Sequence, residues 1–147
     1  MSAKKRRSKR PSVANSDQSP EIRTLYLDRN LGKHLIADAL RAASYAVEVH
    51  DDHLPIDAPD EHWIELVAKN GWIAITKDKN IRYRHAEIES VKASGARVVV
   101  RAKNVTGSDL AILLIKHYQR IQDFARKNKT TFVVGLDRNG KLSLYLL

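Results

Sequence analysis

The chain has 147 residues, of which 43% are hydrophobic and 29% are charged, and its net charge is +9. This length suits one folded domain with a sizeable core, and the balance of residues excludes a fully disordered or fibrous chain. The chain contains no cysteine, which excludes disulfides, thiolate zinc sites and cysteine nucleophiles and leaves carboxylates and histidines for chemistry.

The first 20 residues carry a disproportionate share of the positive charge. Six Lys and Arg side chains accompany a single Asp there and give +5, whereas residues 21–147 together give +4. Such a stretch buries too little apolar surface to fold, so we predict a disordered basic tail over residues 1–20 and one folded domain over residues 21–147. The tail either binds a phosphate backbone or is a solvated end without a specific role.

Short β-rich apolar runs alternate with segments of helical periodicity from Ile22 onward, which predicts an α/β fold of βαβ units around a parallel sheet. Strands are expected at Ile22–Leu27, Tyr45–Val49, Trp72–Thr76 and Ala96–Arg101, followed by a closing hairpin of Thr130–Leu136 and Leu142–Leu146. Helices are expected at Leu31–Ala43, about 61–69 and Arg84–Ser94, and a long helix from an N-cap at Ser108 to Ala125.

The longest uninterrupted apolar run, Leu110–Ile115, is far shorter than the roughly 20 residues that span a bilayer. The basic N-terminus also lacks the apolar stretch of a secretory signal. We therefore expect a cytoplasmic protein without a membrane partner.

Acidic residues lie where an open parallel sheet binds its ligands, just outside the carboxyl ends of strands. Asp28 follows the first predicted strand, Asp78 follows the third, and Asp60 opens the second helix. If the first and third strands flank one crevice, these carboxylates converge there and repel each other unless a cation neutralises them. Oxygen ligands of this kind select Mg²⁺ or Mn²⁺, which can hold a phosphate oxygen and activate water.

Each of these acids also has a purely structural interpretation. Asp28 and Asp60 are favoured residues for capping the helices that follow them. Glu61 is favoured in a first helical turn by the helix dipole, and Asp78 suits a turn in which it bonds to its own backbone.

Further polar residues surround the three acids in the sequence. The run His50–His53 contains metal-binding residue types without the spacing of a defined motif, and we retain only Asp52 from it, together with Glu61, as additional acids. Four basic residues near the strand ends are candidates for RNA binding, or else they form a charge-balancing solvated face: Arg29, Lys77, Lys79 and Arg82.

Four blocks of this sequence, taken in order, resemble a PIN-like domain, in particular the branch related to VapC-type toxins. The blocks are Leu27–Gly32, His50–Asp52, Pro59–Trp63 and Ile75–Arg82, and the resemblance covers most of residues 22–135. It implies a three-layer α/β/α fold with a mainly parallel sheet, and it matches Asp28, Asp60 and Asp78 to the acids that bind Mg²⁺ or Mn²⁺ in an endoribonuclease. Related sequences commonly carry a second acid two residues after Asp78, where this chain has Asn80. This difference favours one metal ion and leaves the choice between one and two open.

The leading hypothesis is therefore a metal-dependent endoribonuclease that hydrolyses RNA. The resemblance further implies the toxin of a type II toxin–antitoxin system, with an antitoxin protein and a second copy of the chain as partners. One alternative is a non-catalytic PIN-like module that binds nucleic acid and uses its acids as helix caps. Another is a phosphoacceptor α/β regulator, suggested by acids after strands and by Thr76 beside Lys77.

Overall fold

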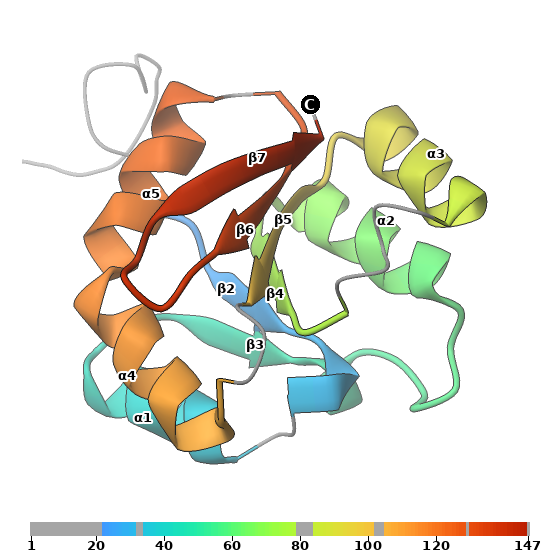
Figure 1. Ribbon diagram of the computed structural model, residues 1–147. Helices are drawn as coiled ribbons and strands as arrows, with labels where there is room; N and C mark the ends of the chain where they lie inside the picture. Colours follow the sequence, from blue (N-terminus) through green and yellow to red (C-terminus); the bar gives the residue numbers. More distant parts are fainter. Residues whose placement is uncertain (1–21, 32–33, 79–83, 102–104, 129, 147) are drawn as a thin grey trace, which may run out of the picture.

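The computed structural model describes residues 22–31, 34–78, 84–101, 105–128 and 130–146, so the predicted basic tail lies outside the described residues. The strands are β2 (Leu25–Leu27), β3 (Val47–Val49), β4 (Ile73–Thr76), β5 (Arg97–Arg101), β6 (Phe132–Leu136) and β7 (Leu142–Leu146). The helices are α1 (Leu35–Ala42), α2 (Asp60–Asn70), α3 (His85–Ser94), α4 (Gly107–Lys116) and α5 (Tyr118–Lys127) (Figure 1). Two 3-10 turns, Arg29–Leu31 and His50–Asp52, follow β2 and β3.

The strands form one sheet in the order β3-β2-β4-β5-β6-β7. The pairs are parallel from β3 to β6, and the last pair, β6 with β7, is antiparallel. The chain runs from β2 outward to β3 and then returns past β2 to β4, so the direction of the connections reverses between β2 and β4. This confirms that the first and third predicted strands are neighbours, and it puts a topological switch point between them.

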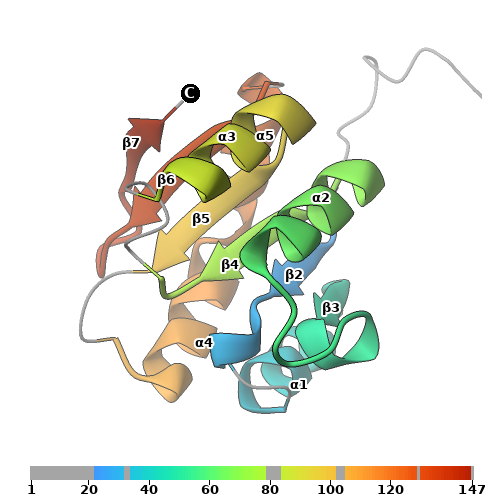
Figure 2. The same ribbon diagram turned by 90° about the vertical axis from the view of Figure 1, so that its right-hand side faces the viewer.

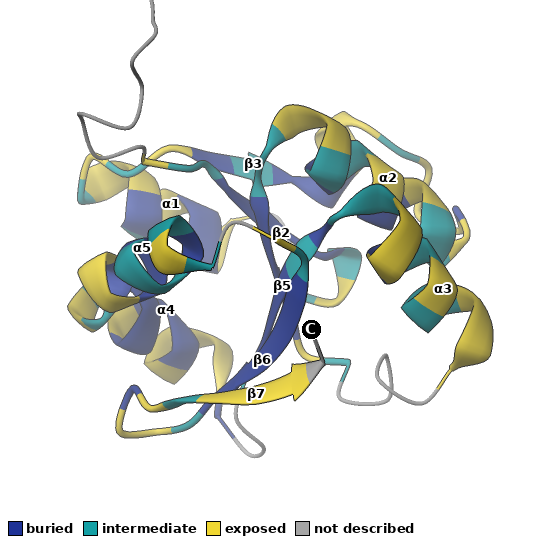
Figure 3. Ribbon diagram, turned by 90° about the horizontal axis from the view of Figure 1, so that it is seen from above, coloured by how far each residue is buried: buried dark blue, intermediate teal, exposed yellow. Residues whose placement is uncertain are grey.

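Helices cover both faces of the sheet. Leu25 and Leu27 belong to a core cluster that includes α1, α4 and α5, whereas Tyr26 between them belongs to a second cluster that includes α2 and α3. Figures 2 and 3 show these two helical layers on either side of the buried strands. Because successive side chains alternate between two covered faces, the strands read as nearly continuous apolar runs. The predicted three-layer α/β/α fold is confirmed.

The long helix predicted from Ser108 to Ala125 is wrong in two respects. The chain forms two helices, α4 and α5, which His117 separates, and the N-cap is Thr106, whose Oγ1 accepts a hydrogen bond from the Asp109 N–H at 3.2 Å. The apolar spacing continues across the break, because Leu114 and Tyr118 share one core cluster. The helical periodicity of the sequence therefore did not indicate the break between α4 and α5.

The segment around the first strand also differs from the prediction. The strand begins at Leu25 and not at Ile22, and the helix predicted over Leu31–Ala43 is divided into the 3-10 turn Arg29–Leu31 and helix α1. The 3-10 turn closes on the first strand through a hydrogen bond from the Leu31 N–H to the Asp28 carbonyl at 2.9 Å. The chain thus turns tightly at Asp28.

The predicted C-terminal hairpin is confirmed. The Asp137 carboxylate accepts hydrogen bonds from the N–H groups of Asn139 and Lys141, and Gly140 adopts a φ of +82° that favours glycine. None of the helices in the described part of the chain has the length and apolar character needed to cross a membrane.

Candidate functional site

The ends of the two strands at the switch point are joined through Thr76. The Asp28 N–H donates to the Ile75 carbonyl at 3.0 Å, which carries the pairing of β2 and β4 one residue beyond β2. Thr76 is fully buried, and its hydroxyl donates to Oδ2 of Asp28 at 2.8 Å while accepting from the Asp78 N–H at 3.1 Å. The Thr76 hydroxyl thus fixes the buried Asp28 carboxylate, which follows β2, relative to the backbone of Asp78, which follows β4.

Asp28 is the most deeply buried of the acids, with 2% of its surface exposed. Its Oδ1 accepts a hydrogen bond from the Arg29 N–H at 2.8 Å, so it also holds the turn after β2, but the N-cap residue of α1 is His34 and not Asp28. Burial raises the pKa of the Asp28 carboxyl, and the negative charge of Asp60 adds to the rise, although the hydrogen bonds from Thr76 and Arg29 oppose it. A cation at this site would therefore stabilise the charged form.

Asp60 is the first residue of α2, but it does not cap the helix. The N-cap is Pro59, and no side chain caps the helix there, so the capping interpretation of Asp60 is wrong. Its Oδ1 instead accepts from Nε1 of Trp63 and from Nη2 of Arg29, both at 2.9 Å. Arg29 is held in turn by the carbonyl of Ala58, to which its Nη1 donates at 2.5 Å. These contacts fix one oxygen of Asp60 and direct Oδ2 toward Arg84, 3.7 Å away.

Arg84, the N-cap residue of α3, links Asp60 to two further acids. Its Nη1 lies 2.5 Å from Oδ2 of Asp78 and 3.2 Å from Oε1 of Glu87. Burial raises the pKa of Glu87, and Arg84 opposes this rise, whereas the charges of Asp60 and Glu61 add to it. The sequence prediction missed Glu87, although an acid in the first turn of the helix after β4 was a usable signal.

The two additional acids differ in position. Glu61 is half-buried in the first turn of α2 and acts electrostatically on Glu87. Asp52 is exposed on the turn His50–Asp52, and among the described residues no hydrogen bond or ion pair joins it to the other acids.

His50 serves the fold and not a metal site. Its ring is buried, with Nε2 2.8 Å from the Pro55 carbonyl and Nδ1 2.7 Å from the Tyr26 hydroxyl. Because a carbonyl only accepts, Nε2 carries the proton and Nδ1 accepts from Tyr26. Both ring nitrogens are thus used, and the metal-binding interpretation of the His50–His53 run fails for this residue.

The predicted RNA-binding residues occupy different surroundings. Lys77 is exposed between Thr76 and Asp78, whereas the Arg29 guanidinium is engaged by Asp60 and Ala58. Lys79 and Arg82 lie outside the described residues, and so does Asn80, on which the expectation of one metal ion depends.

The carboxylate oxygens of these acids are the type of ligand that a hard divalent cation binds. In the described structure, however, they do not surround a position that could hold such an ion. Among the residues that the structure describes, no three Asp, Glu or His side chains are close enough to hold a metal ion. Instead, the Arg84 guanidinium lies among three of the carboxylates. Carboxylate oxygens without sulfur are the ligands that Mg²⁺ and Mn²⁺ prefer, and Arg84 stands in for a cation among them.

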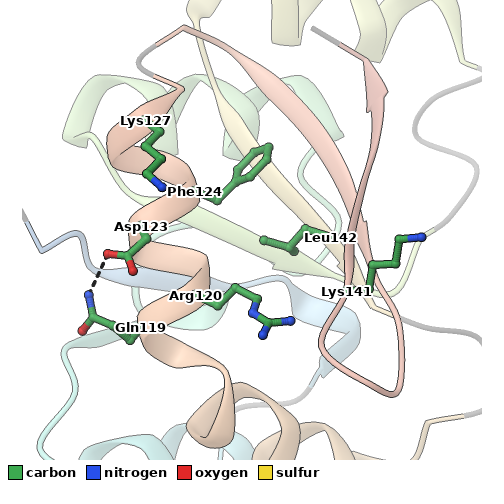
Figure 4. Close-up of a pocket in the computed structure, with 7 residues that line it drawn as sticks. All are labelled: Gln119, Arg120, Asp123, Phe124, Lys127, Lys141 and Leu142. Carbon is green, nitrogen blue, oxygen red and sulfur yellow. Dashed lines mark hydrogen bonds between the residues drawn. The ribbon is translucent and has the colours of Figure 1, made fainter.

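A separate open hollow of about 510 Å³ lies between α5 and β7. Figure 4 shows Arg120 and Lys127 on the helix and Lys141 on the hairpin around Phe124 and Leu142. Arg120 donates to the Gly140 carbonyl at 3.1 Å and so ties the hairpin turn to the helix. Asp123 is the one acid that lines this hollow in the described structure, so the hollow lacks the paired carboxylates of a hydrolytic site.

Comparison with known proteins agrees with this geometry. The family described as "PIN like domain" matches residues 24–103, which include all four acids around Arg29 and Arg84. A Mycobacterium tuberculosis protein named "Putative ribonuclease VapC45" is 32% identical over 78 residues, which cover 50% of this chain and 56% of that protein, so the match spans just over half of the relative's length. The search of solved structures gave no match. The family model matches more than half of the length of this chain, which shows that the chain belongs to the PIN-like domain family.

Proposed function

We propose that this protein is a metal-dependent endoribonuclease in which Asp28, Asp60 and Asp78 bind one Mg²⁺ or Mn²⁺ ion and hydrolyse RNA. The observation that carries the proposal is that Asp28 after β2, Asp60 at the start of α2 and Asp78 after β4 lie around the switch point of the sheet. Thr76, Arg29 and Arg84 link them to one another. The match to the PIN-like family and the similarity to a protein named as a ribonuclease support it.

The chain's own residues supply a rigid set of oxygen ligands. Thr76 and the Arg29 N–H orient the two oxygens of Asp28, while Trp63 and Arg29 hold one oxygen of Asp60 and leave the other for a ligand. When bound, a divalent cation would neutralise this charge, lower the pKa of water and polarise the phosphate. In the hydrolysis, the water oxygen bonds to phosphorus as the bond from phosphorus to the 3′ oxygen breaks, and the 3′ oxygen leaves with a proton.

The proposal includes a surface for the RNA backbone. Lys77 is exposed next to Asp78 in the chain, so a phosphate chain that crosses the carboxylates would meet its positive charge. Lys79 and Arg82, which follow in the sequence, stay predicted RNA-binding residues. The division into a basic tail over residues 1–20 and a domain over residues 21–147 stays a prediction.

We extend the proposal to a cytoplasmic toxin of a type II toxin–antitoxin system, with an antitoxin protein and a second copy of the chain as partners. The support for this step is the similarity to the VapC-type relative over about half of its length.

The direct test is cleavage of a labelled single-stranded RNA by the purified protein in Mn²⁺, Mg²⁺ or EDTA. We expect cleavage with either metal, none in EDTA, and a loss in Asp28→Asn and Asp78→Asn larger than the roughly 10- to 100-fold that loss of an outer-shell partner costs. Asp38→Asn removes an exposed acid from α1 and is the matched control.

A non-catalytic nucleic-acid-binding module is the second candidate. The observation in its favour is that guanidinium groups already pair with Asp60, Asp78 and Glu87. It predicts that wild type and Asp78→Asn are equally inert toward RNA in every metal and bind it with the same salt dependence. That result would replace the nuclease proposal.

A further inference from the structure

A single nitrogen of Arg84 lies among the carboxylates of three different segments. Nη1 is within 3.7 Å of oxygens from Asp78 after β4, Glu87 in α3 and Asp60 at the start of α2. A positive charge held among three converging carboxylates is the environment that a bound cation would have. Mg²⁺ binds oxygen ligands at about 2.0–2.1 Å, so the same oxygens would have to move closer to the point that this nitrogen now occupies.

We propose that Arg84 is a built-in counter-cation that holds the acids together in the metal-free protein, and that a divalent cation displaces it toward the phosphate of bound RNA. This inference rests on the proposed function, because Asp60 and Asp78 are among the proposed metal ligands, and it assigns Arg84 two exclusive positions. In one position the guanidinium pairs with the acids, and in the other it pairs with the substrate.

The two arginines of the site differ in how they are held. Arg29 is anchored to the backbone, since it donates to the Ala58 carbonyl as well as to Asp60, and its side chain is 21% exposed. Arg84 is 44% exposed, and its side-chain partners among the described residues are all carboxylates. A cation that neutralises those carboxylates therefore removes what holds Arg84, whereas Arg29 keeps its backbone contact.

The displaced side chain has a suitable second partner. A guanidinium presents two parallel N–H groups that match the oxygens of a phosphate, which an ammonium does not. Arg84 is next to the proposed metal ligands, so a displaced guanidinium would still be close to a phosphate that binds at those ligands. Metal binding and RNA binding are thereby coupled through one side chain.

The first experiment measures Mn²⁺ binding by calorimetry without RNA. Arg84→Gln removes the competing charge, so we expect Mn²⁺ to bind about tenfold tighter or more. Arg84→Lys keeps the charge and should bind Mn²⁺ within about threefold of wild type, yet raise the KM for RNA about tenfold because the two-pronged phosphate contact is lost. Arg126→Gln is the matched control, because Arg126 pairs with Asp123 at 2.9 Å on α5 and its loss changes the net charge equally.

A second measurement needs no variant and therefore does not depend on the folding of one. Arginine modification by phenylglyoxal, followed by mass spectrometry, should increase at Arg84 when Mn²⁺ saturates the wild-type protein and stay constant at Arg126. Unchanged or weaker Mn²⁺ binding by folded Arg84→Gln, or equal labelling of Arg84 with and without Mn²⁺, would overturn the inference even if wild type cleaves RNA. Absence of Mn²⁺ binding by both wild type and Arg84→Gln would overturn the proposed function as well.

Discussion

Replacing Thr76 by valine tests how the buried carboxylate of Asp28 is stabilised. Valine has nearly the shape of threonine, but it removes the hydroxyl that donates to Asp28 at 2.8 Å and accepts from the Asp78 N–H at 3.1 Å. Both Thr76 and Asp28 are almost fully buried, so water does not easily replace either contact. The substitution leaves the carboxylate with one fewer donor and the Asp78 N–H without this acceptor.

The expected loss of free energy of unfolding follows from these two contacts. A hydrogen bond to a charged group contributes about 1.5–3 kcal/mol and a neutral one about 1 kcal/mol. The methyl group that valine adds is buried and stabilises the folded protein by about 0.8 kcal/mol. We therefore expect Thr76→Val to lower the free energy of unfolding by about 2–3 kcal/mol near pH 8. Thr76→Ser keeps both contacts and loses one methyl group, so it should cost about 1 kcal/mol at any pH.

The cost of Thr76→Val should depend on pH in one direction. Burial already raises the pKa of Asp28 in the folded protein, and the Thr76 hydroxyl opposes that rise. Its removal raises the folded pKa further above the unfolded value of about 3.9. A carboxyl group whose pKa is raised by folding does not lower the free energy of unfolding at pH values below its unfolded pKa. It lowers that free energy progressively as the pH rises through its folded pKa. The cost of Thr76→Val is therefore smallest near pH 4 and largest above the folded pKa.

Urea unfolding in EDTA at a series of pH values measures this cost for wild type, Thr76→Val and Thr76→Ser. The difference between the two variants should widen as the pH rises. If Thr76→Val costs the same at pH 4 and pH 8, or no more than Thr76→Ser at pH 8, then the hydroxyl does not stabilise the charged carboxylate and our account of the junction between β2 and β4 is refuted.

Three further predictions concern single side chains. His50→Leu should destabilise the fold by about 2–3 kcal/mol in urea unfolding, because the Tyr26 hydroxyl and the Pro55 carbonyl lose their buried partner; an unchanged stability combined with lost Mn²⁺ binding would restore the metal interpretation. Gly140→Ala should lower the stability more than Gly95→Ala, which serves as its control at about 1 kcal/mol. Both glycines have positive φ, but only a Cβ on Gly140 meets the His117 ring, so equal losses of stability would contradict this contact. Asp28→Asn should stabilise the metal-free protein near pH 8, because burial raises the pKa of the Asp28 carboxyl, and the gain should disappear as the pH falls toward 4. A loss of stability at pH 8 would show that the contacts of the carboxylate outweigh the effect of its burial.

The fold could be predicted because buried parallel strands leave a strong signal in the sequence. The runs around Leu25–Leu27 and Val98–Val100 are apolar at successive positions, since one face packs on α1, α4 and α5 and the other on α2 and α3. Gly71 and Gly95 marked the ends of α2 and α3, where both adopt the left-handed conformation. The positions of Asp28 and Asp78 followed from the rule that sites lie at the carboxyl ends of strands.

What could not be predicted depends on contacts between segments distant in the sequence. The burial of His50 is decided by Tyr26 and Pro55, neither of which periodicity relates to it. The ring of His117, which separates α4 from α5, lies beside Gly140 of the hairpin, and helical periodicity does not indicate this neighbour. The pairing of Arg84 with Asp60 likewise requires that α2 and α3 lie side by side, which the sequence of either helix alone does not reveal.

The charges of the site explain why a divalent cation suits it better than a further side chain would. Four carboxylates, those of Asp28, Asp60, Asp78 and Glu87, outnumber the guanidinium groups of Arg29 and Arg84 by two charges when all are ionised. Burial raises the pKa values of Asp28 and Glu87, and the negative charge of Asp60 adds to both rises. A cation of charge +2 that takes the place of Arg84 brings the cluster one more positive charge than the guanidinium did, and the displaced guanidinium carries its own charge to the phosphate of the substrate. The same excess of negative charge would therefore drive metal binding and make Arg84 available to RNA.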